Sequence, residues 1–387
     1  MIKKNRIIKF LKWVTIVFSS LIILIYALNL EYILKGVRVI YLTGHNTAFI
    51  SDYKYFDNRK IKNSNPQPWA LHKNYNSFNE SKNLKKLNEK RKTKAFLVIK
   101  NDSIIFEKYY DGHSKSTISN SFSVAKSIVT SMLGKAIMEN KIESLDQRVS
   151  DFFVEYKDGL ASELTVGHLA SMSSGMEWNE KYYSVLNITS ESYFTDDLRS
   201  LILKQKIVNK PGQKFRYSSG DTQLLGMIIE KATGSTLSDY LSEKFWKPMG
   251  AEHAALWQLD SKDSGMEKAY CCIASTSRDF ARFGKLYINN GKWNDELILD
   301  SSFINLSINP VFEDSQFYGY GWWLYNYKGK KVFTMNGHLG QFIISFPEEN
   351  IIVVRLGDYN TKGNTDDGSG DLFQYISEGY KIATLTE

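Results

Sequence analysis

The longest apolar stretch of the chain lies near its amino terminus. Val14–Leu28 is interrupted only by Thr15, Ser19 and Ser20. Together with the apolar residues among 10–13, it approaches the roughly 20 residues that a membrane-spanning helix needs. Five basic residues and no acidic one precede it, namely Lys3, Lys4, Arg6, Lys9 and Lys12. A positive flank of this kind predicts an amino terminus in the cytoplasm and the remainder of the chain outside.

Two other interpretations of this stretch compete with an anchor. A cleaved signal peptide has the same charge pattern, but no A-x-A-like cleavage site follows the apolar run. A buried helix would be unusual if it were apolar on all sides and began with a cluster of cations. We therefore expect residues 1–30 to form an uncleaved anchor, with signal cleavage and secretion as the alternative.

Alternating and continuous apolar runs predict strands near both ends of the remaining chain. AFLVIK (95–100) and SIIFEKYY (103–110) flank an Asn101-Asp102 turn, which is typical of a β-hairpin. Near the carboxy terminus the expected strands are KKVFTMNG (330–337), QFIISF (341–346) and NIIVVRLG (350–357).

Helical spacing dominates the middle of the chain. In residues 123–140, Val124, Ile128, Met132 and Ala136 recur four apart, which predicts an amphipathic helix. Further helices are expected over Leu224–Ala232, Asp279–Asn289 and, at the end, Leu372–Ala383. This order predicts an α/β fold, in which both ends build one antiparallel sheet and a helical insert lies between them.

The segment between the anchor and the first hairpin is mixed. Residues 63–69 (NSNPQPW) read as a loop, and the lysines and arginines of 82–94 follow helical spacing, which favours a solvated helix face. Attraction of these cations to lipid headgroups is a second possibility. We therefore divide the chain into an anchor (1–30), a leading segment (31–92) and a main domain (93–387).

Composition narrows the possible partners. The formal net charge of +7 falls to +2 without the five basic residues at the start, so no basic footprint for nucleic acid remains. The two cysteines, Cys271 and Cys272, are adjacent, and we expect two buried free thiols because neighbours rarely reach disulfide geometry. Six scattered histidines and the lack of CxxC or HExxH motifs predict neither a metal nor another cofactor.

The predicted helix at 123–140 begins with a possible nucleophile. Ser123 and Lys126 are three residues apart, so they share a helix face and can touch. A buried lysine loses its charge more readily and can then accept the serine proton. Because Ser123 lies at the helix start, its backbone N–H could also stabilise an oxyanion.

The S-x-x-K pattern alone is weak. Ser51 and Lys54 fit it too, but no amphipathic helix follows them, and we interpret that copy as chance. A purely structural alternative is that Ser123 caps the helix beside an exposed lysine. Two later segments favour a catalytic role for Ser123 instead. They are FRYSSGDTQLLG (215–226), which contains Tyr217, and NGHLGQF (336–342), which contains His338.

Together these segments resemble the serine β-lactamase and DD-peptidase superfamily, in particular its class C-like branch with esterases and 6-aminohexanoate-dimer hydrolases. The family order is S-x-x-K, Y-x-N, then K-T-G or H-x-G. Here it corresponds to Ser123-Val-Ala-Lys126, Tyr217-Ser-Ser219 and His338-Leu-Gly340. The sequence between the motifs is also similar to the family, for example SLDQRVSDFF (144–153) and LTVGHLASMSSGM (164–176). The resemblance runs from about Ala95 to the end.

The resemblance implies a β-lactamase/transpeptidase-like fold, with an antiparallel sheet flanked by helices and a helical subdomain. Ser123 would form the acyl-enzyme, and Lys126 and Tyr217 would move the proton. The backbone N–H groups of Ser123 and Gln341 would form the oxyanion hole. Substrate would be bound by Ser219, His338 and Gly340.

Departures from the family pattern refine the expected activity. Ser219 replaces the usual asparagine, and His338 replaces the lysine that grips a carboxylate. Both changes favour an esterase or amidase over a β-lactamase. An additional active-site tyrosine of the aminohexanoate-dimer hydrolase group would correspond to Tyr182 or Tyr183.

The leading hypothesis is therefore a serine hydrolase of a small ester or amide, held at the bacterial cytoplasmic membrane with its catalytic domain outside. A DD-carboxypeptidase or β-lactamase is one alternative, and a non-catalytic sensor or binding module is another. A conventional α/β-hydrolase is disfavoured because no G-x-S-x-G elbow occurs.

Overall fold

The computed structural model describes residues 2–182, 184–359 and 369–385. Its centre is a seven-stranded sheet in the order β10-β11-β12-β13-β3-β4-β2. Every neighbouring pair is antiparallel except β2 and β4, which are parallel at one edge. The strands are β2 (Ala70–Leu71), β3 (Thr93–Lys100), β4 (Ser103–Tyr109), β10 (Trp323–Tyr327), β11 (Lys330–Gly337), β12 (Gln341–Phe346) and β13 (Ile351–Gly357). The predicted sheet built from both ends is confirmed.

The first hairpin forms because its turn residues accept left-handed backbone. Asn101 and Asp102 have φ of 46° and 61°, as a two-residue turn that matches strand twist requires. The first strand of this hairpin, β3, also pairs with the last strand, β13, and Val98 lies opposite Val353 in that pair. Contacts between the two ends of the main domain therefore lie at the sheet centre.

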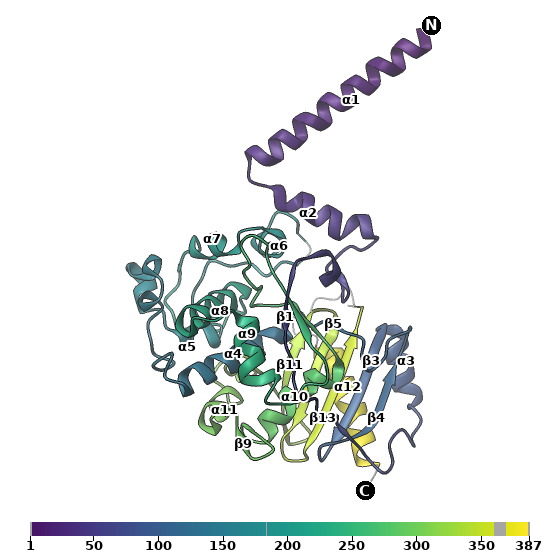
Figure 1. The fold of residues 1–387 in the computed structure, drawn as a ribbon, viewed down its shortest axis with the longest axis vertical. Helices are drawn as coiled ribbons and strands as arrows, with labels where there is room; N and C mark the ends of the chain where they lie inside the picture. Colours follow the sequence, from purple (N-terminus) through teal and green to yellow (C-terminus); the bar gives the residue numbers. More distant parts are fainter. Residues whose placement is uncertain (1, 183, 360–368, 386–387) are drawn as a thin grey trace.

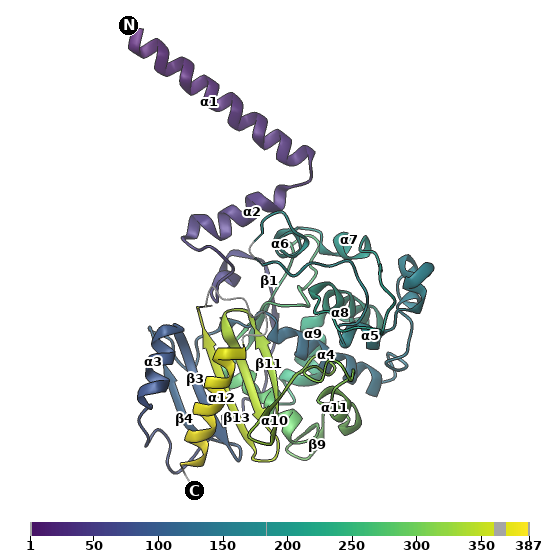
Figure 2. The same ribbon diagram turned by 180° about the vertical axis from the view of Figure 1, so that it is seen from behind.

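Both faces of the sheet are covered by helices. Phe96 and Val98 of β3 pack with α3 (Lys82–Lys90) and α12 (Ser369–Thr384), whereas Leu97 and Ile99 belong to the core on the opposite face. This alternation is the two-residue period of a strand buried on both sides. Figure 2 shows α12 lying across one face of the sheet, and α10 (Ser277–Ile288) packs on the other.

The helix after Ser123 is not amphipathic. α4 (Val124–Met138) is buried on nearly all sides, including Ser127, Thr130 and Ser131 on its polar face. These hydroxyls are satisfied by carbonyls, for example Ser127 Oγ donating to Gly321 O and Thr130 Oγ1 donating to Lys126 O at 3.0 Å. The prediction of an amphipathic helix was wrong because α4 lies between the sheet and the helical part of the molecule.

The helical part follows α4, beside a small sheet in the order β1-β6-β7-β5. Its strands are β1 (Asn58–Ile61), β5 (Ser119–Asn120), β6 (Ala255–Gln258) and β7 (Ile273–Ser275), and a separate hairpin joins β8 (Lys292–Trp293) to β9 (Glu296–Leu297). The helices are α5 (Val166–Ala170), α6 (Ile188–Phe194), α7 (Leu198–Leu203), α8 (Ser219–Thr233), α9 (Leu237–Leu241) and α11 (Ser301–Ser307). The expected helices near 224–232 and 279–289 are confirmed as α8 and α10.

The amino-terminal helix α1 (Ile2–Ala27) projects away from the body (Figure 1). Its Asn5–Ala27 portion is long and apolar enough to cross a membrane, and none of it is buried in the protein. After three residues, α2 (Glu31–Val39) begins and packs on α6 at one end of the body. The chain therefore passes directly from an exposed apolar helix into the folded part.

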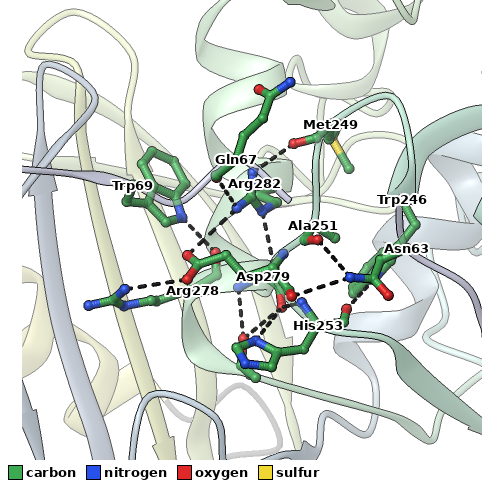
Figure 3. A network of polar contacts seen from close by, with 12 residues as sticks. Asn63, Gln67, Trp69, Trp246, Met249, Ala251, His253, Arg278, Asp279 and Arg282 are labelled. Atoms are coloured by element: carbon green, nitrogen blue, oxygen red, sulfur yellow. Dashed lines mark hydrogen bonds and ion pairs between the residues drawn. The ribbon is translucent and has the colours of Figure 1, made fainter. Parts of the chain in front are cut away.

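The leading segment is integrated into the body rather than detached. It supplies β1 to the small sheet and β2 to the large one. Figure 3 shows how residues 63–69 are held against α10: Arg282 donates to Gln67 O at 2.7 Å and to Met249 O at 2.6 Å. Asp279 accepts from Arg282 Nε at 3.0 Å, so this buried cation is paired with a carboxylate.

Two expectations about individual side chains are corrected. Arg91, in the basic run expected to be solvated, is buried and bridges to Asp371, because the run leads directly into the sheet. Cys271 and Cys272 are buried as expected, but they are joined in a disulfide rather than left as free thiols. The backbone at Cys272 is left-handed, with φ of 74°, and so departs from the extended form in which neighbouring side chains point apart.

Candidate active site

The candidate nucleophile lies where the chain turns from β5 into α4. Phe122, immediately before it, has φ of 48°, an uncommon conformation for a bulky residue. The Phe122 N–H donates to Asn120 Oδ1 at 3.0 Å, and Asn120 Nδ2 donates to the buried Asp52 at 2.9 Å. This chain of contacts holds the strained turn and with it the position of Ser123.

Ser123 occupies the N-cap position of α4 but makes no side-chain capping hydrogen bond. The interpretation of Ser123 as an ordinary N-cap is therefore wrong. Its Oγ lies instead 3.1 Å from Lys126 Nζ, one helical turn further on. The predicted S-x-x-K contact forms, and Ser123 remains partly exposed to a pocket.

Lys126 is 2% exposed and is surrounded by neutral oxygens. Its ammonium donates to Ser123 Oγ at 3.1 Å, to Ser219 Oγ at 3.1 Å and to Tyr270 O at 2.9 Å. Burial lowers the pKa of Lys126 to about 8, although the charges of Glu180 and Asp221 oppose this shift. About a tenth of the lysine is thus neutral at pH 7 and about half at pH 8, and this neutral form is the one that a general base requires.

Tyr217 reaches the same place from the start of α8. Its side chain is close enough to Ser123 for that residue to lower its pKa slightly, and its ring centroid is 5.0 Å from Lys126 Nζ. Burial raises the pKa of Tyr217 above its usual value. The phenol therefore keeps its proton and is suited to donating rather than to removing one.

Two carboxylates that were not anticipated lie behind this cluster. Glu180 accepts a hydrogen bond from the Ser219 N–H. Asp221 is fully buried and accepts from Ser174 Oγ at 2.6 Å, and burial raises its pKa to about 7. Neither acid belongs to a recognisable motif, since an isolated acidic residue near a serine carries no signal in a single sequence.

His338 lies at the end of β11, in the turn that leads to β12. Its ring stacks on Tyr182 at 5.4 Å and meets Phe122 edge-on at 5.4 Å between ring centroids. Its Nε2 is 3.2 Å from Thr47 Oγ1. Burial lowers the pKa of His338 to about 4, so the ring is neutral at pH 7.

The rest of the H-x-G turn is shaped by Arg355. Gly340 has φ of 78°, and a Cβ there would lie 2.6 Å from Arg355 Nη1. That guanidinium donates to Leu339 O at 2.6 Å and to Gly340 O at 2.8 Å. Gln341 supports the turn through its side-chain amide, which donates to His338 O at 3.0 Å. The left-handed backbone and the close guanidinium together therefore require a glycine at position 340.

Of the two tyrosines considered as additional site residues, Tyr182 lines the pocket beside His338. Tyr183 lies outside the described residues. The pocket encloses about 940 Å³ of empty space when its open mouth is included. Among the described residues no group of three His, Cys, Asp or Glu side chains could hold a metal ion.

Comparison with known proteins assigns the family. A sequence model described as Beta-lactamase matches residues 81–372. Protein flp of Staphylococcus aureus is 22% identical over 304 residues, covering 69% of this chain and 60% of that protein. The 6-aminohexanoate-dimer hydrolase of Paenarthrobacter ureafaciens is 25% identical over 214 residues, covering 51% of this chain and 53% of that enzyme. The chain thus spans little more than half the length of these relatives.

Solved structures agree on the fold. A Bacillus anthracis protein described as a candidate 6-aminohexanoate-dimer hydrolase superposes with a TM-score of 0.69 at 22% identity, covering 85% of this chain and 91% of that one. A class C β-lactamase superposes with a TM-score of 0.58 at 18% identity, covering 82% and 99%. With the family match covering most of its length, the chain belongs to the β-lactamase family of serine hydrolases, esterases and penicillin-binding proteins.

Proposed function

We propose that this protein hydrolyses an ester or amide bond through an acyl-enzyme on Ser123. The observation that carries the proposal is the contact between Ser123 Oγ and Lys126 Nζ at 3.1 Å, in a site where no carboxylate of the described residues lies within hydrogen-bonding distance of the lysine. A lysine so placed is held by neutral acceptors and can lose its proton, which is what activation of a serine requires.

In the proposed acylation, neutral Lys126 takes the hydroxyl proton as Ser123 Oγ bonds to the substrate carbonyl carbon. The carbonyl oxygen becomes an oxyanion, which the backbone N–H groups of Ser123 and Gln341 would stabilise. As the bond to the leaving group breaks, Tyr217 donates its proton to the leaving oxygen or nitrogen. The Lys126 ammonium then returns a proton to Tyr217, so the acyl-enzyme forms with no net change of charge.

Deacylation reverses these roles. A water molecule attacks the acyl carbon while neutral Lys126, assisted by Tyr217, accepts its proton. The proton then passes to Ser123 Oγ as the acyl bond breaks, and the acid product leaves. The free serine and the neutral lysine are regenerated.

His338 favours esters or amides over carboxylate-bearing β-lactams and peptides. With its pKa lowered to about 4 by burial, this ring carries no positive charge at neutral pH. A site that grips a substrate carboxylate needs a cation or several donors at that position. We assign His338, Ser219 and the Gly340 backbone to positioning the substrate, with His338 held by Thr47 and Tyr182.

The proposal is tested by covalent labelling of the full-length protein with a fluorophosphonate probe. We expect a single adduct on Ser123, and we expect Ser123→Ala to abolish both labelling and ester hydrolysis, a loss of at least about 10⁴-fold in kcat. Thermal stability should be unaffected because Ser123 caps no helix N–H.

The chain offers its own control for this experiment. Ser51 belongs to the second S-x-x-K pattern, where only a short 3₁₀ turn follows (Asp52–Tyr55). Ser51→Ala should label and turn over as the wild type does. Labelling that maps elsewhere than Ser123, or turnover that survives Ser123→Ala, would refute the mechanism. Nitrocefin turnover comparable with ester turnover would overturn the assignment of His338.

A further inference from the structure

The pocket beside Ser123 is lined by chemically different groups of residues. Polar groups of Ser123, Ser219 and His338 contribute to its lining. The remaining lining comes largely from helix α2, the adjoining segment 40–48 and residues 184–194, and Thr47 of that segment reaches His338 at 3.2 Å. The candidate nucleophile therefore shares one pocket with residues that closely follow α1.

The α2 wall is fixed in place by specific contacts. Tyr32 donates from its hydroxyl to Val185 O at 3.1 Å, and Lys35 Nζ donates to Asp196 at 2.6 Å. At Gly36 the helix backbone comes so close to α6 that a Cβ would lie 3.3 Å from the ring of Phe194. The helix is thus docked as part of the site.

Large apolar side chains remain exposed at this end. Val37 is 39% exposed, Leu42 is 78% exposed and Val185 is 47% exposed, and the first and last of these line the pocket itself. Exposed apolar side chains beside a pocket indicate a surface that contacts a further apolar partner or a membrane. The preceding helix, α1, indicates which of these it is.

A membrane is the apolar phase that α1 indicates, since this helix is long and apolar enough to cross one. Ala27 ends α1 and Glu31 begins α2, and four Cα–Cα steps span at most about 15 Å. The headgroup region of a bilayer is roughly 5–8 Å deep on each side. If α1 spans the membrane, α2 and the pocket mouth must lie at or next to the headgroups on the outer side.

We infer that the substrate is an amphiphile of the outer leaflet, whose apolar chain lies along α2 and residues 184–194 while its ester or amide group reaches Ser123. This inference rests on the proposed hydrolase function. Burial of each methylene against this wall would favour the longer-chain substrate by about threefold to fourfold until the wall is covered.

The test compares substrates that differ only in chain length. Full-length protein in phosphatidylglycerol–phosphatidylcholine vesicles would be assayed with p-nitrophenyl acetate, octanoate and laurate. We expect kcat/KM for laurate to exceed that for acetate by at least about 10²-fold. Equal or falling values along the series would overturn the inference while leaving Ser123 catalysis intact, whereas no turnover and no Ser123 labelling would remove the proposed function itself.

Two variants and a matched control locate the effect on the α2 wall. Val37→Asp and Val185→Asp should each lower kcat/KM for laurate by at least about 10-fold, and by a clearly larger factor than for acetate. Val154→Asp, at a residue 63% exposed in a short 3₁₀ helix outside the pocket, should change neither. An equal loss on both substrates, or none on laurate, would contradict the proposed role of this wall.

Discussion

Among the described residues two lysines are buried, and only one of them contacts a possible nucleophile. Lys126 is 2% exposed and Lys268 is 0% exposed, and burial lowers the pKa of both. Lys268 Nζ donates to Tyr193 O at 2.6 Å and lies 3.8 Å from the ring centroid of Phe56. Lys126 instead contacts a serine hydroxyl that lines a pocket.

The comparison shows that a lowered lysine pKa does not by itself mark a catalytic group. Lys268 connects the leading segment, through Phe56 and the nearby charge of Asp52, to α6. Within the described part of the chain, its ammonium donates to a carbonyl of α6 and to no serine hydroxyl. What distinguishes Lys126 is its neighbour Ser123 and the access of that neighbour to a substrate.

Replacing each lysine by methionine should separate the two roles most clearly. Lys126→Met removes the base, and we expect kcat to fall by about 10²–10⁴-fold with KM changed little. Lys268→Met leaves the Tyr193 carbonyl without its donor, so we expect a loss of about 1–3 kcal/mol in the free energy of unfolding with kcat nearly unchanged. Steady-state kinetics and urea denaturation of both variants measure this, and a large loss of kcat in Lys268→Met would contradict the distinction.

Tyr217→Phe tests the acid next to Lys126. Without the phenolic proton, departure of a poor leaving group is slowed, whereas p-nitrophenolate leaves without help. We expect kcat on an anilide to fall by about 10²-fold, and kcat on the matching p-nitrophenyl ester to fall much less. Identical losses on the two substrates would show that Tyr217 positions Ser123 rather than donating a proton.

The pH dependence of kcat/KM should report the pKa of Lys126. The neutral form is the active one, so the rate rises about tenfold per pH unit and levels above about pH 8, where burial places this pKa. A profile with no such limb, or with one near the pKa of an ordinary lysine, would count against Lys126 as the base.

The smallest expected effect is a displacement of that limb by Glu180→Gln. The charge of Glu180 raises the pKa of Lys126, so its removal lowers that pKa and moves the limb to lower pH. A shift of roughly half a unit would increase kcat/KM at pH 7 about twofold to threefold. Glu177→Gln, at an exposed acid three residues away, should leave the profile unchanged, and a shift to higher pH in Glu180→Gln would refute the electrostatic account.

Local signals in the sequence determined a large part of this structure. The Asn101-Asp102 turn predicted the first hairpin because both residues tolerate left-handed backbone. The three-residue spacing of Ser123 and Lys126 predicted their contact because helix geometry alone brings such residues together. The order of strands and helices was sufficient to predict a sheet built from both ends, since apolar runs and turn residues act over a few positions.

Tertiary structure alone decided the surroundings of those residues. The third acceptor of Lys126 is the carbonyl of Tyr270, which is 144 residues away in the chain. Burial of the polar face of α4, burial of Arg91, the disulfide at Cys271 and the entry of α2 into the pocket wall were likewise invisible in the pattern. Each depends on which distant segments pack together, and burial and charge at a site are properties of that packing rather than of any one segment. The sequence by itself therefore predicted the contact between Ser123 and Lys126, whereas packing between distant segments set the pKa of the lysine and shaped the pocket beside the serine.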